Sequence, residues 1–234
     1  MPRKSWATTP IKEIKMLPPR YSNANLNFAY TPMFNGLSTQ EKYLPMASEY
    51  LQALYDTVHK ALNEYPRVLA FRVDPVIPTE ISERLTIEDH KRLIKRFIAS
   101  LKAIIKHDRE RKRQNGWVPD TKVRYVWSRE IGSNGKPHYH FFFLFNRDAY
   151  HMLGRACSPN ENLISRVSRA WYSALGIVWN PQDPWVHVPA NPFYWIDRGD
   201  ANSFQEAFYR ASYLCKAETK QYGLGVRTFG TSRS

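Results

Sequence analysis

Two histidines and a glutamate in one predicted β-hairpin have the clearest potential for chemistry in this sequence. His138 and His140 are separated by one residue in a strand-forming segment, so both imidazoles point to the same face of the strand. The Ser-Asn-Gly sequence at 133–135 suits a three-residue hairpin loop, which would place Glu130 directly opposite His138. Directly opposed residues have Cβ atoms about 4.5–5.5 Å apart. Two imidazoles and a carboxylate in one small patch could hold a divalent metal ion and leave positions open for water or a phosphate oxygen.

The same pattern also has an explanation without chemistry. Residues 139, 141, 143 and 145 are aromatic and alternate with the histidine face, so they are expected to be buried under helices. A strand of this kind can carry two half-exposed histidines with no function, and His-x-His alone is a weak motif. The facing Glu130 favours the metal interpretation. Because the site offers a carboxylate and no thiolate, we expect Mg²⁺ or Mn²⁺ rather than structural zinc.

A second group of reactive side chains lies in the last predicted helix. Tyr209 and Tyr213 are four residues apart and Lys216 follows three residues later, which puts all three on one helix face. A phenol beside a metal-bound phosphate can attack phosphorus and become covalently attached to a DNA end. Free phenol has a pKa of about 10, so a metal ion or a cation such as Lys216 must favour the phenolate. The alternative is that the tyrosines only pack in the core, because the same helix also has an apolar face.

The elements that must position these groups alternate between helices and strands. Apolar periodicity and capping residues predict helices over about 46–65, 86–113, 158–175 and 203–220, with Thr86 as one cap and two capping boxes, Ser158 with Glu161 and Ser203 with Glu206. Strands are expected at 67–74, in the hairpin at 122–146, and near 186–188 and 193–195. Since the central pair is joined by a tight turn, it must be antiparallel. We therefore expect a single α+β domain with a central antiparallel β-sheet and flanking helices.

Composition restricts the partners and the compartment. The chain has 234 residues, with 34 Lys and Arg against 21 Asp and Glu, which gives a net charge of +13 and favours a polyanion such as nucleic acid. No apolar run is long enough to span a bilayer or to act as a secretory signal, so we expect a cytoplasmic protein without a membrane partner. The two cysteines, Cys157 and Cys215, are far apart in sequence, which excludes a disulfide scaffold and a cysteine zinc site.

Proline and glycine divide the chain into three predicted parts. Residues 1–45 are proline-rich and basic toward the N-terminus, and are expected to form an extended arm that either follows a phosphate backbone or lies over the core. Residues 46–222 form the predicted catalytic domain. Residues 223–234 contain several glycines and arginines, and are expected to form a short basic tail.

Several sequence blocks together resemble a known family. The blocks RVLAFRVDPVIP, RYVWSREIGSNGKPHYHFFFLFNRDAY and ASYLCKAETK, followed by VRTFGTSR, are similar to the inovirus-type rolling-circle replication initiators. These belong to the HUH endonuclease superfamily, and prophage proteins of the YagK/YfjJ type are placed in the same family. The resemblance extends from about Tyr43 to Arg233 and implies an HUH-like antiparallel sheet.

The resemblance also implies an activity. It is that of an endonuclease that nicks and rejoins single-stranded origin DNA through a 5′-phosphotyrosine, using Mg²⁺ or Mn²⁺. It makes Tyr213 the nucleophile and Lys216 its partner, His138 and His140 metal ligands, and Glu130 a third ligand. The expected partners are origin DNA and a host helicase and polymerase.

The sequence departs from some relatives at one position. Those relatives have a second tyrosine directly after the lysine, where this chain has Ala217. We therefore expect a single nucleophile, with Tyr209 in a supporting role. Basic residues near these motifs are candidate DNA contacts: Arg129, Lys136, Lys220 and Arg227.

Two other functions compete with this hypothesis. A DNA-binding prophage regulator on the same fold would bind DNA without cleaving it. A small-molecule metallohydrolase could use Glu130, His138 and His140, but it would leave Tyr213 and the positive charge without a purpose.

Overall fold

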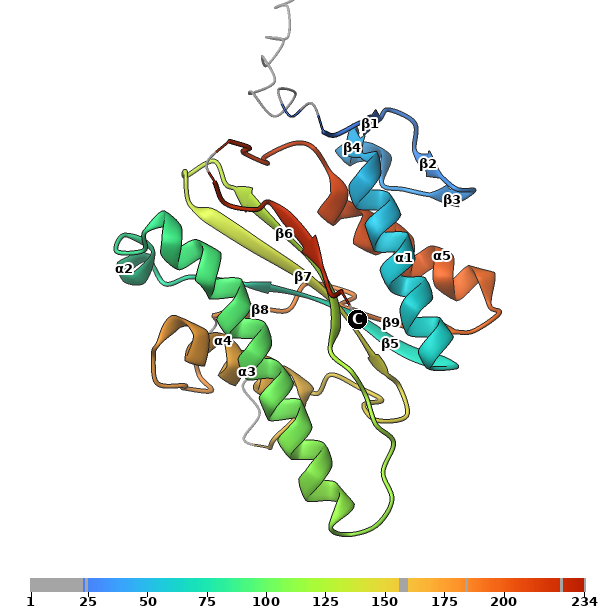
Figure 1. Cartoon of the computed structure of the whole chain (residues 1–234), viewed down its shortest axis with the longest axis vertical. Helices are drawn as coiled ribbons and strands as arrows, with labels where there is room; N and C mark the ends of the chain where they lie inside the picture. The colour runs from blue at the N-terminus through green and yellow to red at the C-terminus, as the bar shows by residue number, and fades with distance from the viewer. Residues whose placement is uncertain (1–22, 24, 156–159, 184, 224, 234) are drawn as a thin grey trace, which may run out of the picture.

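An antiparallel β-sheet forms the centre of the molecule in the computed structural model, which describes residues 23, 25–155, 160–183, 185–223 and 225–233 (Figure 1). Its strands follow the order β10 (Phe229–Thr231), β6 (Arg124–Ile131), β7 (Pro137–Asn146), β5 (Arg67–Pro75) and β8 (Val186–His187), and β9 (Phe193–Asp197) also pairs with β5. Every pairing in this sheet is antiparallel. The predicted α+β class with a central antiparallel sheet is therefore confirmed.

Helices cover both faces of the sheet. Figure 1 shows α3 (Ile87–Arg113) and α4 (Leu163–Leu175) on one side, and α1 (Ser48–Glu64) and α5 (Ala201–Ser212) on the other. Because side chains alternate along a strand, β7 contributes to two cores. Its odd-numbered aromatic residues, such as Phe141, pack with α3 and α4, whereas Phe142 and Leu144 pack with α1 and α5. The even-numbered residues of β7, which include both histidines, therefore face the side of α1 and α5.

The β6–β7 hairpin has the register that the sequence predicts. Glu130 pairs with His138 and Ile131 with Pro137. The Gly132 amide donates a hydrogen bond to the carbonyl of Lys136 at 2.9 Å, which closes the turn. Gly135 has a φ of 73°, a left-handed conformation that a residue without Cβ adopts at little cost. The turn chemistry alone was thus sufficient to place Glu130 opposite His138.

The early helices match their predicted ranges closely, whereas the start of α4 does not. Thr86 caps α3 in a capping box with Asp89. Helix α4 begins at Leu163 because the Asn162 side chain accepts the Ser165 amide at 2.9 Å. The predicted capping box is therefore wrong for α4, although Ser158 and Pro159 themselves lie outside the described residues. The helix ends at Leu175 as expected, and Gly176 follows with a φ of 75°.

The last helix begins and ends earlier than predicted. Asp200 caps α5 by accepting the amides of Asn202 and Ser203, so the predicted cap, Ser203, lies inside the helix. The α-helix ends at Ser212, and a 3₁₀ turn, η3, spans Tyr213–Cys215. The prediction that the helix continues to Lys220 is therefore wrong. The reason is a tertiary contact, since the Ala217 amide donates to the carbonyl of Pro45 at 2.9 Å and Lys216 forms a β-bridge with Met46.

Parts of both predicted terminal segments are built into the body. The N-terminal part contains β1 (Phe28–Ala29), β2 (Met33–Phe34), β3 (Leu37–Ser38) and η2 (Glu41–Tyr43), followed by β4 (Met46–Ala47), which pairs with β1. The Gln40 side chain donates to the carbonyls of Tyr209 and Arg210 in α5. At the other end, β10 pairs with β6. The described residues before Met46 and after Gly223 therefore contribute to the packed structure.

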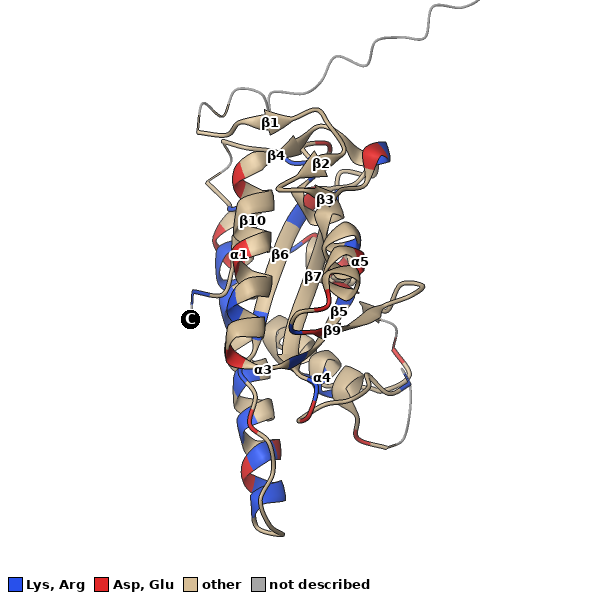
Figure 2. Cartoon of the chain, turned by 90° about the vertical axis from the view of Figure 1, so that its right-hand side faces the viewer, with Lys and Arg blue, Asp and Glu red and all other residues tan. Residues whose placement is uncertain are grey.

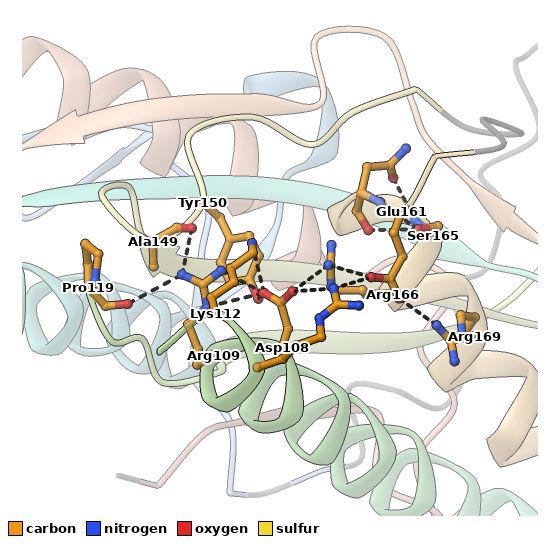
Figure 3. Close-up of polar contacts among 12 residues, drawn as sticks. Asp108, Arg109, Lys112, Pro119, Ala149, Tyr150, Glu161, Ser165, Arg166 and Arg169 are labelled. Atoms are coloured by element: carbon orange, nitrogen blue, oxygen red, sulfur yellow. Dashed lines mark hydrogen bonds and ion pairs between the residues drawn. The ribbon is translucent and has the colours of Figure 1, made fainter. Parts of the chain in front are cut away.

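A buried carboxylate joins α3 to α4 on the face away from the histidines (Figure 3). Asp108 accepts hydrogen bonds from Arg166 at 2.7 Å, Arg109 at 2.7 Å and the Tyr150 hydroxyl at 2.6 Å, and it pairs with Lys112 at 3.2 Å. We call these five residues the Asp108 cluster. Five basic side chains in this region pair with Asp108 or Glu161, and two of them, Arg111 and Arg169, lie at the exposed rim.

Short elements complete the description. Helix α2 (Thr79–Ser82) lies between β5 and α3. Cys215 is buried with a free thiol, and Cys157 lies outside the described residues. Within the described part of the chain, no helix has both the length and the apolar character needed to cross a membrane.

Candidate active site

A second buried carboxylate, Glu130 in β6, is the centre of the candidate site. It is 4% exposed, and side chains from β7 and from the segment after α5 surround it. Its Oε2 atom contacts Lys216 Nζ at 2.8 Å, Thr219 Oγ1 at 3.0 Å, and Tyr213 Oη and His140 Nε2 each at 3.4 Å. Lys220 Nζ lies 3.7 Å from Oε1. We call these six residues the Glu130 cluster: Glu130, His140, Tyr213, Lys216, Thr219 and Lys220.

Tyr213 and Lys216 form the pair that the sequence predicts, but through a different backbone geometry. Lys216 Nζ donates to Tyr213 Oη at 2.8 Å and lies 4.1 Å from the centre of its ring. A 3₁₀ turn brings residues i and i+3 directly above one another, so the turn at η3 aligns the two side chains. The Tyr43 ring meets the Tyr213 ring edge-on at 4.8 Å, and the Arg72 guanidinium lies 4.2 Å from it. The phenol is therefore held from several sides.

His140 is fixed by a carboxylate that the sequence analysis did not single out. Its Nδ1 lies 2.8 Å from Asp74 Oδ1, and Asp74 is held by two contacts of 2.9 Å from Arg72. A histidine bonded to a carboxylate at one ring nitrogen and aimed at a site with the other is typical of metal ligands. A signal was present in the sequence, because Arg72 and Asp74 are polar residues two apart on a strand that is otherwise apolar.

His138 lies apart from the Glu130 cluster. It is exposed and lines a cavity of about 340 Å³ together with His140, Asp74, His187 and Lys136. His187 is a further residue that the sequence analysis missed, and it pairs with Asp74 across β8 and β5. The cavity therefore brings three imidazoles from separate parts of the sheet to one opening.

The predicted metal ligands agree with a divalent cation in their chemistry. Glu130 Oε1 is buried and has no hydrogen-bond partner, and His140 Nε2 faces the same carboxylate. As the side chains lie, however, the described residues contain no group of three His, Cys, Asp or Glu close enough to hold an ion. Glu130 and His140 are together, while His138 must turn from its place above the cavity to join them.

Electrostatics in the cluster favour a charged carboxylate and a charged lysine. Burial would raise the pKa of Glu130, but the hydrogen bond from His140 and the charges of Lys220 and Lys216 hold it well below its usual range. Burial would lower the pKa of Lys216, but the Glu130 charge raises it overall. Burial would also lower the pKa of His140, and its bonds to Asp74 and Glu130 raise it overall. Lys220 differs, because burial lowers its pKa to about 8.

The tyrosine is protonated in this arrangement. Burial and the neighbouring Glu130 charge raise the pKa of Tyr213, although Lys216 and Arg72 act in the opposite direction. The Lys216 ammonium already donates a hydrogen bond to the phenolic oxygen. It is thus positioned to stabilise negative charge on that oxygen when the proton leaves.

The other predicted site residues lie in different surroundings. Tyr209 is on α5 with 45% of its surface exposed, and no contact among the described residues joins its ring to the Glu130 cluster. Lys136 lines the cavity of His138, and Arg227 is exposed beside a second cavity of about 560 Å³. Arg129 and Lys220 are buried, so as the structure stands neither presents its charge at the surface. Their predicted role as DNA contacts stays a prediction.

Comparisons with known proteins identify relatives over almost all of the described chain. A family model described as the YagK/YfjJ C-terminal domain matches residues 30–232. The Uncharacterized protein YfjJ of Escherichia coli (strain K12) is 35% identical over 196 residues, which cover 80% of this chain and 94% of that protein. The Uncharacterized protein YagK of the same organism is 34% identical over 193 residues, or 79% of this chain and 92% of that protein. No solved structure matches the chain.

Proposed function

The chain belongs to the YagK/YfjJ C-terminal domain family, and we propose that it is a tyrosine endonuclease of the HUH type, dependent on a divalent metal. In this proposal it nicks and rejoins single-stranded origin DNA for the rolling-circle replication of a phage, prophage or plasmid. The protein would act in the cytoplasm of the host cell. A host helicase and polymerase would extend the released end.

One observation carries the proposal. The Lys216 ammonium lies 2.8 Å from both the Tyr213 hydroxyl and the Glu130 carboxylate, and His140 Nε2 lies 3.4 Å from the same carboxylate oxygen. A nucleophile, a cation and two metal-ligand types therefore meet around one atom. Desolvating Lys216 and Glu130 costs free energy, and both groups contact the tyrosine hydroxyl directly.

The phenol would act as the nucleophile. Tyr213 Oη attacks the scissile phosphorus, the new O–P bond forms as the bond from phosphorus to the 3′ oxygen breaks, and the phenolic proton passes to water. The departing 3′ oxygen gains a proton and becomes a 3′ hydroxyl that can prime synthesis. Lys216 stabilises the negative charge that develops on the phenolic oxygen. Because the phosphodiester becomes a phosphotyrosine, a later 3′ hydroxyl can attack it and restore the DNA strand.

Glu130, His138 and His140 are the residues that would hold Mg²⁺ or Mn²⁺. When bound, the cation would polarise the scissile phosphate as a Lewis acid. Asp74 would orient the His140 ring, and Arg72 would fix Asp74. The Glu130 charge, which raises the pKa of Tyr213 in the present arrangement, would be offset when the carboxylate binds a cation.

The decisive experiment compares two tyrosine variants. Purified wild type, Tyr213→Phe and matched Tyr209→Phe protein are incubated with Mn²⁺ and single-stranded oligonucleotides that tile the DNA on either side of the gene. Wild type and Tyr209→Phe should form a covalent protein–DNA adduct that survives denaturing electrophoresis, and Tyr213→Phe should form none. An adduct at the wild-type level with Tyr213→Phe would show that the nucleophile is another residue.

A second function is favoured by one feature of the site. Lys216 forms an ion pair with Glu130 Oε2, in the carboxylate that would bind a metal ion, and His138 lies apart from Glu130 and His140. This arrangement also suits a protein that binds DNA without cleaving it. In that case the same oligonucleotides should shift the protein in a native gel, and no adduct should form at any Mn²⁺ concentration. Detection of a wild-type adduct excludes this alternative.

A further inference from the structure

Helix α3 presents a row of positively charged side chains on its outer face, with the exposed Glu110 among them. This helix has 27 residues, and Figure 2 shows Lys and Arg following it along one side of the molecule. The exposed cations recur at helical spacing, and we call them the basic stripe: Lys91, Arg92, Lys95, Arg96, Lys102, Lys106 and Arg113. At about 1.5 Å per residue, the stripe extends about 33 Å along the helix.

Three of the seven cations have no carboxylate partner in the described part of the chain, and the other four form exposed salt bridges. Lys91 and Arg92 both pair with Glu88 at 3.3 Å, and Arg113 pairs with Asp120 at 3.3 Å. No salt bridge among the described residues joins Lys95, Arg96 or Lys102 to a carboxylate. Lys106 pairs with Glu110 only at 3.7 Å, and both side chains are more than half exposed. Exposed pairs of this kind contribute little free energy and are easily exchanged for a phosphate. The stripe therefore differs from the neighbouring Asp108 cluster, whose arginines, Arg109 and Arg166, are buried.

The composition of the stripe favours the backbone of duplex DNA as its ligand. No exposed large hydrophobic residue lies between positions 91 and 113, although Trp117 is exposed four residues beyond the end of the stripe. The exposed residues between the cations are Ala99, Ala103, His107 and Glu110. Binding of single strands uses aromatic side chains on which bases stack, and insertion into a membrane surface uses large apolar side chains. A straight row of about 33 Å without either matches one turn of B-form DNA, which is about 34 Å long. We infer that the basic stripe binds the phosphate backbone of double-stranded DNA.

The stripe begins at the end of the sheet where the candidate site lies. His90, next to Lys91, lies with its Nδ1 2.8 Å from the Tyr139 hydroxyl, and Tyr139 separates the two histidines of β7. Lys136 in the hairpin also donates to Thr79 in α2, just before α3. A duplex along α3 would thus end beside the β6–β7 hairpin. Under the proposed nicking function, the stripe would bind the duplex that flanks the single-stranded target. Only this last step rests on the proposed function.

The test compares two variants with the same loss of charge. Lys95→Gln/Lys102→Gln removes two cations of the stripe, and Lys60→Gln/Arg67→Gln removes two exposed cations from α1 and β5. The probe is a fluorescent 30-base-pair duplex of arbitrary sequence, titrated at several salt concentrations. For wild type and the control, the logarithm of the binding constant should fall with the same slope against the logarithm of salt. For the stripe variant, the slope should be shallower by about 1.8, which is two lost phosphate contacts.

Several results would overturn the inference. One is an equal change of slope in the stripe variant and the control. Another is wild-type protein that binds a single-stranded 30-mer or anionic lipid vesicles but not the duplex. Tyr213→Phe protein should bind the duplex as tightly as wild type, since this measurement needs no cleavage. Failure of the nicking proposal and failure of the duplex inference are therefore distinguished by separate measurements.

Discussion

The sheet separates two buried carboxylates that have similar neighbours and different properties. Asp108 lies on the side of α3 and α4, and Glu130 on the side of α1 and α5. Each is less than 5% exposed, each contacts at least two basic side chains, and each accepts a hydrogen bond from a tyrosine hydroxyl. The nearest basic side chains differ, since Asp108 is held mainly by arginines and Glu130 by lysines and a histidine.

That difference decides what each cluster can do. Arginine keeps its charge under all ordinary conditions and forms rigid planar contacts, so Arg109 and Arg166 hold Asp108 as a permanent connection between helices. Lysine and histidine change protonation or release a partner more readily. Glu130 also keeps one buried oxygen without a hydrogen-bond partner. We therefore assign a structural role to the Asp108 cluster, and the proposed function assigns the chemical role to the Glu130 cluster.

The largest effect should come from removing the charge of Asp108. Asp108→Asn leaves Arg109, Arg166 and Lys112 without their shared carboxylate, and breaking a buried pair in this way costs about 3–5 kcal/mol. We expect a loss of that size in the free energy of unfolding, measured by urea denaturation at pH 7. The rate of adduct formation per folded molecule should not change. A slower rate in fully folded variant protein would break the proposed division of roles.

The pH dependence of this variant provides a control. Burial alone would raise the pKa of Asp108, but hydrogen bonds from Tyr150 and Arg109 and the charge of Arg166 lower it overall. A carboxyl whose pKa is lower in the folded state contributes stability above its ordinary pKa of about 4, and this contribution is lost as pH falls. The stability difference between wild type and Asp108→Asn should be full at pH 6–7 and should shrink below about pH 4. A difference that stays constant with pH would mean that the charge is not responsible.

The next largest effect should come from Lys216, and on the reaction rather than on stability. Lys216→Met keeps the length of the side chain and removes the ammonium that contacts Tyr213 and Glu130. Removing one donor to a developing oxyanion lowers rates by about 10²–10³. We expect a decrease of this size in the single-turnover rate of adduct formation. Stability should fall less than for Asp108→Asn, because His140, Thr219 and Lys220 remain around Glu130.

One result would reverse the assignment of the chemical role to the Glu130 cluster. It is a Lys216→Met protein that reacts at the wild-type rate but loses as much stability as Asp108→Asn. The Glu130 cluster would then be a second structural connection. Lys216→Arg is the matched control, since it retains the charge but not the shape of the ammonium, and it should recover part of the rate.

A smaller effect is expected at Asp74, which positions His140 without belonging to the Glu130 cluster. Removing such an outer partner of a histidine ligand typically weakens metal binding about 10–100-fold. Asp74→Asn should therefore weaken Mn²⁺ binding by that factor in isothermal titration calorimetry. Asp148→Asn, at a partly exposed salt bridge with Arg67, should bind like wild type. If both variants bind Mn²⁺ equally, His140 is not a ligand that Asp74 orients.

The smallest effect is expected at Gly132. A Cβ added there would lie 2.6 Å from His138 Nε2, so the ring must move, but it is an exposed side chain and can do so at low cost. Gly132→Ala should weaken Mn²⁺ binding a few-fold and should leave the midpoint of urea denaturation almost unchanged. In His138→Ala protein the same substitution should have no further effect on Mn²⁺ binding. Additive losses in the double variant would show that the two residues act independently.

Local chemistry was sufficient to predict part of this structure. The turn at 133–135 set the hairpin register, and with it the pairing of Glu130 with His138. Thr86 marked the start of α3 because its capping box has no strong competitor nearby. In both cases the residues that decide the structure are close together in sequence, so a single sequence is enough to find them.

The errors have two origins, ambiguous local signals and contacts between segments that are distant in sequence. Asp200 and Ser203 are both good caps for α5, and their local signals do not decide between them. The end of α5 is set by Pro45 and Met46, which are distant in sequence and bind the backbone at Ala217 and Lys216. Asp74 was missed because its role depends on which strand lies beside β7. Long-range pairing of this kind is not encoded in local propensity.

The pairing of Glu130 with His138 limits how this protein can change over evolutionary time. Because neighbouring residues in a strand point to opposite faces, a shift of the hairpin by one residue would move one partner entirely to the other face. A lineage cannot adjust the spacing of these two groups gradually by lengthening or shortening either strand. Variation between Glu130 and His138 should therefore take the form of substitutions within a turn of fixed length. The geometry therefore constrains the length of the loop more than its sequence.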